Sequence, residues 1–67
     1  MTADDLMAHR YLYYVLCRPV ISDREYDEAE KAIMPSLPPD HPLRVPGSDV
    51  ASDYSGEIQA MAMELLA

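Results

Sequence analysis

Residues 21–34 of this chain read ISDREYDEAEKAIM and carry the clearest structural signal in the sequence. Ser22 and Glu25 are spaced as a capping box, in which each side chain bonds a free backbone N–H group at the start of a helix. The helix is expected to end near Met34, because Pro35 disfavours helical geometry in the residue before it. The stretch therefore predicts one helix that begins directly after its serine.

A first helix is predicted upstream, over residues 3–17. Thr2 is a suitable N-cap, the acidic residues after it suit the positive end of the helix dipole, and Pro19 sets the latest possible end. The apolar face carries Ala8, Tyr11, Leu12, Val15 and Leu16, and the opposite face carries His9, Arg10, Tyr13 and Tyr14. Because tyrosines occur on both faces, we expect both faces to make contacts.

Residues 35–48 contain five prolines and one glycine, a composition typical of an extended, polyproline-like connection. A last amphipathic helix is predicted to begin between Asp49 and Gly56, with Ser52 or Ser55 as its cap. The apolar face of this helix should hold Ile58, Met61, Ala62 and Leu65.

Together these elements predict an all-α fold, an antiparallel helical hairpin plus a C-terminal helix in one small three-helix domain. Residues 1–48 are expected to form the hairpin with its proline-rich tail, and residues 49–67 the helix that packs on it. A chain of 67 residues buries only ~60% of the surface that its unfolded form exposes. The core should therefore be marginal, and a ligand or partner would stabilise it.

The charge and the cysteine content restrict the function. Twelve acidic and five basic side chains give a formal net charge of -7, which opposes direct binding to nucleic acid or to an anionic membrane. Cys17 is the only cysteine, and no stretch approaches the ~20 apolar residues of a membrane span. We therefore expect a cytoplasmic protein that binds neither nucleic acid nor membrane.

The residue inventory does not favour catalysis by this chain alone. The sequence has no Gly-rich phosphate loop, no nucleophile elbow and no His-Glu-x-x-His pattern, and its one lysine, Lys31, lies in no nucleophile motif. His9, Cys17 and His41 lack the spacing of metal ligands. We expect no catalytic residue and no metal site, and hence a protein that acts by binding.

One constellation could form a binding site, namely Tyr13, Tyr14, Asp23, Tyr26 and Asp27. The two aspartates are four residues apart, so both carboxylates lie on one stripe of the second helix, and a hairpin would bring them close to the tyrosine pair. Carboxylates suit the hydroxyls of a ribose, and aromatic faces suit a flat cationic ring.

A purely structural interpretation fits the same spacing. Asp23 is favourable near a helix N-terminus in any case, and Tyr26 could fill the core with its hydroxyl at the rim. Asp23, Asp27 and Glu30 would then form a solvated acidic face. Spacing alone favours this interpretation over a ligand site.

A family resemblance changes this balance. HRYLYYVL at residues 9–16, followed by Pro19 and by ISDREYD at residues 21–27, resembles the N-terminal Ia domain of bacterial NAD-dependent DNA ligases. His41-Pro42 is similar to the His-Pro pair that follows the second helix in that family, so that the match covers residues 5–42.

The resemblance implies a helical hairpin that closes over the nicotinamide mononucleotide half of NAD+, while a separate domain supplies the lysine that is adenylated. It places five residues on positions that contact the nucleotide, namely Tyr13, Tyr14, Asp23, Tyr26 and Asp27. It also implies a leucine where this chain has Ala29, and we expect Ile58, Met61 and Leu65 to pack onto the hairpin in compensation.

The chain departs from the family after Pro42, where only a trace of the family pattern remains, and it carries no adenylation-lysine motif. We therefore predict a stand-alone Ia-like module that binds nicotinamide mononucleotide or NAD+ weakly and acts in trans with a ligase adenylation domain, in association with DNA repair or replication. The alternative is a non-catalytic adaptor or inhibitor that binds protein and has lost nucleotide binding. Another copy of the chain, in a homo-oligomer, is a further candidate partner.

Overall fold

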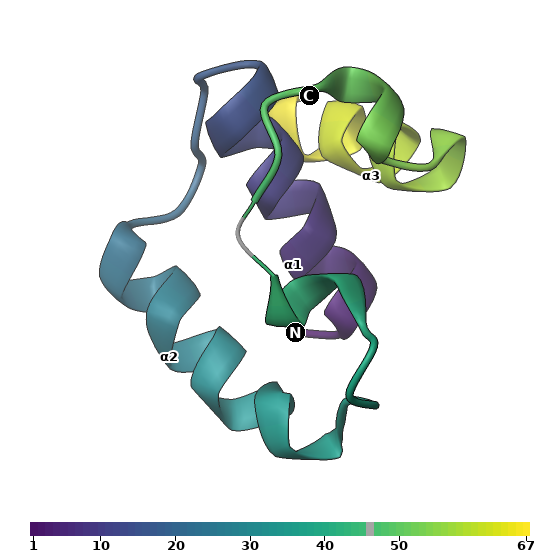
Figure 1. Cartoon of the computed structure of the whole chain (residues 1–67). Helices are drawn as coiled ribbons and strands as arrows, with labels where there is room; N and C mark the ends of the chain where they lie inside the picture. Colours follow the sequence, from purple (N-terminus) through teal and green to yellow (C-terminus); the bar gives the residue numbers. More distant parts are fainter. Residues whose placement is uncertain (46) are drawn as a thin grey trace.

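The computed structural model describes residues 1–45 and 47–67, and every regular element in this part of the chain is helical (Figure 1). Three α-helices are joined by short helical turns, which confirms the predicted all-α class. The elements in chain order are α1 (Ala3–Arg10), η1 (Tyr11–Val15), α2 (Asp23–Ile33), η2 (Met34–Ser36), η3 (Pro42–Arg44), η4 (Ala51–Asp53) and α3 (Gly56–Leu66).

Helix α1 begins with a complete capping box. The Thr2 hydroxyl accepts from the backbone N–H of Asp5 at 3.1 Å, and the Asp5 carboxylate accepts from the backbone N–H of Thr2 at 2.9 Å. The helix continues without a break into η1, a single π-helical turn. Cys17 then adopts a φ of 54°, in the left-handed region, so the chain leaves the helix before it reaches Pro19.

Helix α2 begins where the sequence predicts, because the Ser22 hydroxyl accepts from the backbone N–H of Glu25 at 3.1 Å. Only half of the predicted capping box forms, since the Glu25 carboxylate accepts from the Ser22 hydroxyl at 3.3 Å. The α-helix ends at Ile33 and tightens into the 3₁₀ turn η2. Figure 1 shows α2 running back past α1 in the opposite direction, as the predicted hairpin requires.

The predicted polyproline-like course of residues 35–48 is wrong for most of the described residues. Two 3₁₀ turns, η2 and η3, occupy much of it, since proline is well suited to the first position of such a turn. The Arg44 guanidinium holds the bend by donating to the carbonyl oxygens of Met34, Leu37 and Pro38 at 2.9, 2.7 and 2.8 Å. Pro46 lies outside the described residues.

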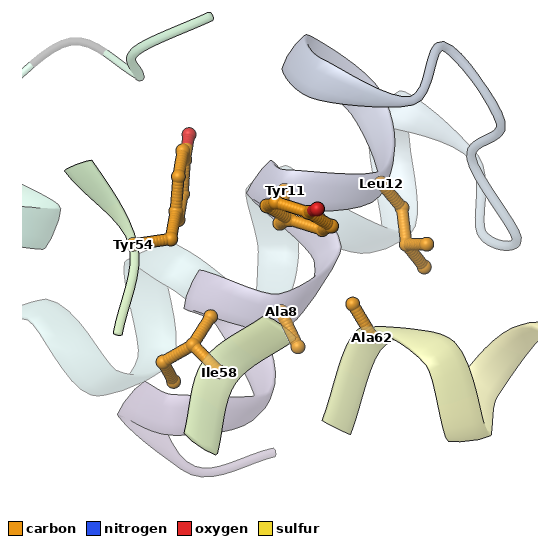
Figure 2. Close-up of a cluster of buried hydrophobic side chains, with 6 residues drawn as sticks. All are labelled: Ala8, Tyr11, Leu12, Tyr54, Ile58 and Ala62. Atoms are coloured by element: carbon orange, nitrogen blue, oxygen red, sulfur yellow. The ribbon is translucent and has the colours of Figure 1, made fainter. Parts of the chain in front are cut away.

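The core lies between α1 with η1 and α3, and its buried residues are Ala8, Tyr11, Leu12, Tyr54, Ile58 and Ala62 (Figure 2). The rings of Tyr11 and Tyr54 meet edge to face, with their centroids 5.3 Å apart. Burial of these side chains holds α3 against α1, and Leu6 and Leu43 are buried outside this cluster.

The predicted apolar face of α3 is wrong at its end. Leu65 is 41% exposed, and Leu66 packs against the core in its place, because burial centres on Ala62, one helical turn before Leu66. Figure 1 shows α1 between α2 and α3. Helix α3 therefore covers the side of α1 away from α2, and does not replace bulk at Ala29. The predicted domain boundary at residues 48 and 49 stays a prediction.

Candidate functional site

A pocket of about 380 Å³ opens between the end of the first helix and the beginning of the second. Its wall is built from α1 and η1, the connection 19–22, the first two turns of α2, and Gly47. All five residues that the sequence nominates line this one pocket, namely Tyr13, Tyr14, Asp23, Tyr26 and Asp27. The hairpin thus brings together side chains that are separated by as many as 14 positions in the sequence.

Two aromatic rings stand at the rim of the pocket. Tyr13 and Tyr14 both belong to the π-helical turn, and their ring centroids lie 5.1 Å apart with an interplanar angle of 75°. The two residues are 46% and 43% exposed, so neither ring is part of the hydrophobic core. Such partly exposed aromatic faces are able to stack on a planar ligand.

The carboxylates of Asp23 and Asp27 stand on the first turns of α2 and are exposed. Neither forms an ion pair within the described part of the chain, where the cations near them pair elsewhere, Arg24 with Glu28 and Arg10 with Glu30. Their oxygens are therefore available to accept hydrogen bonds from a ligand.

The back of the pocket is organised by Arg10, a residue whose role the sequence does not reveal. Arg10 is only 8% exposed, and its Nε donates to the Tyr26 hydroxyl at 2.6 Å. Its Nη2 lies 3.3 Å from the Glu30 carboxylate. Three further donations reach carbonyl oxygens of the 42–45 segment, from Nη1 to Pro42 and Val45 and from Nη2 to Leu43.

This network corrects the expectation for Glu30, which is half-buried and paired with Arg10 instead of lying on a solvated face. Although burial disfavours the charged guanidinium, its bonds to Tyr26 and Glu30 keep the pKa of Arg10 above its ordinary value. Burial raises the pKa of the Tyr26 hydroxyl far above its ordinary value. The phenol is therefore neutral, and its ring is fixed against the pocket wall by its hydroxyl.

His9 lies on the pocket wall one residue before Arg10 and is only 8% exposed. Its Nδ1 atom is buried and has no hydrogen-bond partner among the described residues. Burial lowers the pKa of the imidazole, and the carboxylate of Asp5 opposes this only in part. The ring is therefore neutral at neutral pH. The sequence alone does not reveal a role for this histidine.

Gly47 closes the pocket beside the tyrosine pair. A Cβ atom at this position would overlap the ring of Tyr14, so the ring lies directly on the glycine backbone. The sequence offered no signal for this contact, since the two residues lie 33 positions apart in irregular surroundings.

Within residues 1–45 and 47–67, no group of three or more His, Cys, Asp or Glu side chains is placed to hold a metal ion. Over the same residues, no helix has both the length and the apolar character that a membrane crossing requires.

The fold and the pocket define a small helical module with an acidic, tyrosine-lined pocket. A DNA ligase of Parabacteroides distasonis is 37% identical over 67 aligned residues, which cover 90% of this chain and 10% of that protein. DNA ligases of Pseudothermotoga lettingae and Prosthecochloris aestuarii are 36% and 34% identical over 58 residues, which cover 76% of this chain and 9% of each ligase. No protein-family model and no solved structure matches the chain.

This chain is thus a homologue of a short segment of the DNA ligases, and the predicted resemblance is confirmed at that level. It spans about a tenth of the length of the curated relatives that it matches. That the matched segment is the Ia domain of an NAD-dependent ligase stays a prediction.

Proposed function

We propose that this chain is a nicotinamide mononucleotide-binding module akin to the Ia domain of NAD-dependent DNA ligases, and that the pocket between its first two helices is the binding site. The observation that carries the proposal is that the five nominated residues line one pocket. Its volume of about 380 Å³ falls in the range of ~300–1,000 Å³ that is usual for small-molecule sites.

The nicotinamide ring and the ribose of the ligand each find complementary groups in the pocket. The exposed faces of Tyr13 and Tyr14 suit the planar, positively charged nicotinamide ring, which would be held by stacking and by cation-π attraction. The unpaired carboxylates of Asp23 and Asp27 suit the ribose hydroxyls, which donate hydrogen bonds. The formal charge of -7 favours the cationic ring and disfavours the phosphate of the same nucleotide.

The affinity of the isolated chain is expected to be weak. Four of the five site residues, Tyr13, Tyr14, Asp23 and Asp27, are exposed, so a bound nucleotide would remain uncovered on one side. Weak binding follows, because the entropy of association is offset by few contacts. A ligase adenylation domain that bound in trans would supply the missing wall and raise the affinity.

Isothermal titration calorimetry with nicotinamide mononucleotide and with NAD+, with and without a ligase adenylation domain, tests the proposal. We expect binding in the millimolar range for the chain alone and tighter binding with the second domain. Absence of heat in both arms at millimolar nucleotide would reject nucleotide binding. A chain that bound the adenylation domain but no nucleotide would instead favour the adaptor function.

A pair of neighbouring substitutions supplies a matched control. Asp27→Asn and Glu28→Gln each remove one negative charge from the same exposed turn of α2, but only Asp27 lines the pocket. Asp27→Asn should weaken binding by about tenfold, which is the loss expected for a hydrogen bond to a charged group. Glu28→Gln should leave the affinity unchanged within about twofold, because it removes a screened charge and an exposed pair with Arg24, both outside the pocket.

A further inference from the structure

The described side chains leave the imidazole of His9 without a partner. Its Nδ1 atom is buried and makes no hydrogen bond to a described residue. The nearest acid along the helix, Asp5, is already used in the capping box, where its carboxylate accepts from the backbone N–H of Thr2 at 2.9 Å. A buried polar atom without a partner is uncommon in native proteins and calls for a physical account.

The neighbours of His9 on the pocket wall do not supply the missing hydrogen bond to Nδ1. Arg10 directs its guanidinium to Tyr26, to Glu30 and to backbone carbonyl groups of the 42–45 segment. The Tyr26 hydroxyl accepts from Arg10 Nε at 2.6 Å and makes no hydrogen bond to His9 Nδ1. His9 lines the pocket, so a ligand bound there is able to approach it from that side.

The chemistry of that partner follows from the state of the ring. Burial keeps the imidazole neutral, so it offers one N–H donor and one lone pair and attracts an anion only weakly. A hydroxyl or a carboxamide, which both donates and accepts, matches either tautomer. A phosphate would be better placed elsewhere in the site.

We propose that His9 is a ligand-contacting residue, whose unpaired Nδ1 hydrogen-bonds an uncharged polar group, a hydroxyl or a carboxamide, of the nucleotide bound in this pocket. The inference rests on the proposed function. Because Nδ1 is buried, the proposed contact requires the ring to turn about its Cβ–Cγ bond when the ligand enters. The contact satisfies the buried nitrogen only in the complex, so it contributes to affinity.

Nitrogen NMR of the histidine side chains, in the full chain titrated with nicotinamide mononucleotide, tests the inference without any substitution. His41 is an internal reference, because its Nδ1 already accepts from the backbone N–H of Leu43 at 3.1 Å. We expect the His9 Nδ1 resonance to move on saturation and the His41 resonances to stay. Backbone shifts at Tyr13 and Asp23 without any change at His9 would overturn the inference and leave the proposed function standing.

His9→Phe is the matching variant, since it keeps a planar ring and removes both nitrogens. It should weaken nucleotide binding by roughly 3- to 10-fold, the range expected for one net hydrogen bond. Unchanged affinity in a folded variant would overturn the inference. If the variant does not fold, the nitrogen shifts of the natural chain decide alone. If no residue responds to nucleotide at all, the proposed function itself has failed.

Nicotinic acid mononucleotide distinguishes the two groups that could meet His9. It carries a carboxylate in place of the carboxamide and keeps the ribose hydroxyls. A His9 shift of the same size with both nucleotides supports a hydroxyl contact, and a shift that is lost with the acid supports a carboxamide contact.

Discussion

Arg10 on α1 and Tyr26 on α2 are joined by a hydrogen bond of 2.6 Å from Nε to the phenol oxygen, although 16 positions separate them in the sequence. The same guanidinium binds Glu30 and the carbonyl groups of the 42–45 segment. The residue therefore joins three parts of the chain, and the pocket wall depends on it.

Arg10→Met should destabilise the fold by about 3 kcal/mol, because it leaves the Glu30 carboxylate and several backbone carbonyl groups buried without a partner. That is a large share of the roughly 3–10 kcal/mol expected for a domain of this size. Arg24→Met is the matched control, since the Arg24–Glu28 pair is exposed and should contribute less than about 0.5 kcal/mol. Urea unfolding followed by circular dichroism measures both. Equal losses of unfolding free energy in the two variants would contradict the proposal that Arg10 stabilises the fold through its buried hydrogen bonds.

Gly47→Ala should displace the ring of Tyr14, because the added methyl group occupies the place of that ring. Tyr14 is 43% exposed and can swing aside, so the cost should be modest, about 1 kcal/mol. Gly56→Ala is the control, because nothing lies within 4 Å of a Cβ atom there. The ring-proton shifts of Tyr14 report the displacement, and shifts that match those of the natural chain would rule out the close contact.

Leu66→Ala should cost about 1–2 kcal/mol, since Leu66 is partly buried against the core and its truncation leaves a gap. The adjacent Leu65 is 41% exposed, and Leu65→Ala should cost less than about 0.5 kcal/mol. Thermal unfolding of both variants tests which leucine anchors α3. The reverse order of stability would mean that α3 is rotated from the position described.

Stability should fall as the pH is lowered below about 6.5, the ordinary pKa of histidine. Burial lowers the pKa of His9 in the folded state, so the unfolded chain binds the proton more readily and acid favours unfolding. The contribution of His9 to the free energy of unfolding is complete above pH 6.5. It is lost as the pH falls toward the lower pKa that His9 has in the folded state. The lowered pKa of Asp5 acts in a separate range, below 3.8.

Urea unfolding at a series of pH values tests this, with His9→Phe as the comparison. In the variant, the free energy of unfolding should no longer change with pH between neutral pH and the acidic range that Asp5 governs. A variant that kept the full slope would show that another group is responsible.

The sequence was sufficient for features that depend on neighbouring residues. The start of α2 followed from Ser22 and Glu25, and its end from Pro35. The convergence of the tyrosines with Asp23 followed once two helices were joined by a short connection. Such local signals determine where helices begin, end and turn back.

The features that the sequence did not predict depend on distant contacts. The Arg10–Glu30 pair joins residues 20 positions apart on different helices, which no periodicity reveals. The burial of Leu66 in place of Leu65 depends on where α1 lies beside α3. The 3₁₀ turns around Pro35 and Pro42 form where the proline content predicts an extended chain, and Arg44 holds that bend.

Mapping of backbone amide shifts during a titration with nicotinamide mononucleotide tests the central claim most directly. We expect progressive changes at Tyr13, Tyr14 and residues 22–27, which line or flank the pocket, and little change along residues 57–66 of α3. An absence of shifts at millimolar nucleotide, or shifts confined to α3, would contradict the claim that this pocket binds the nucleotide.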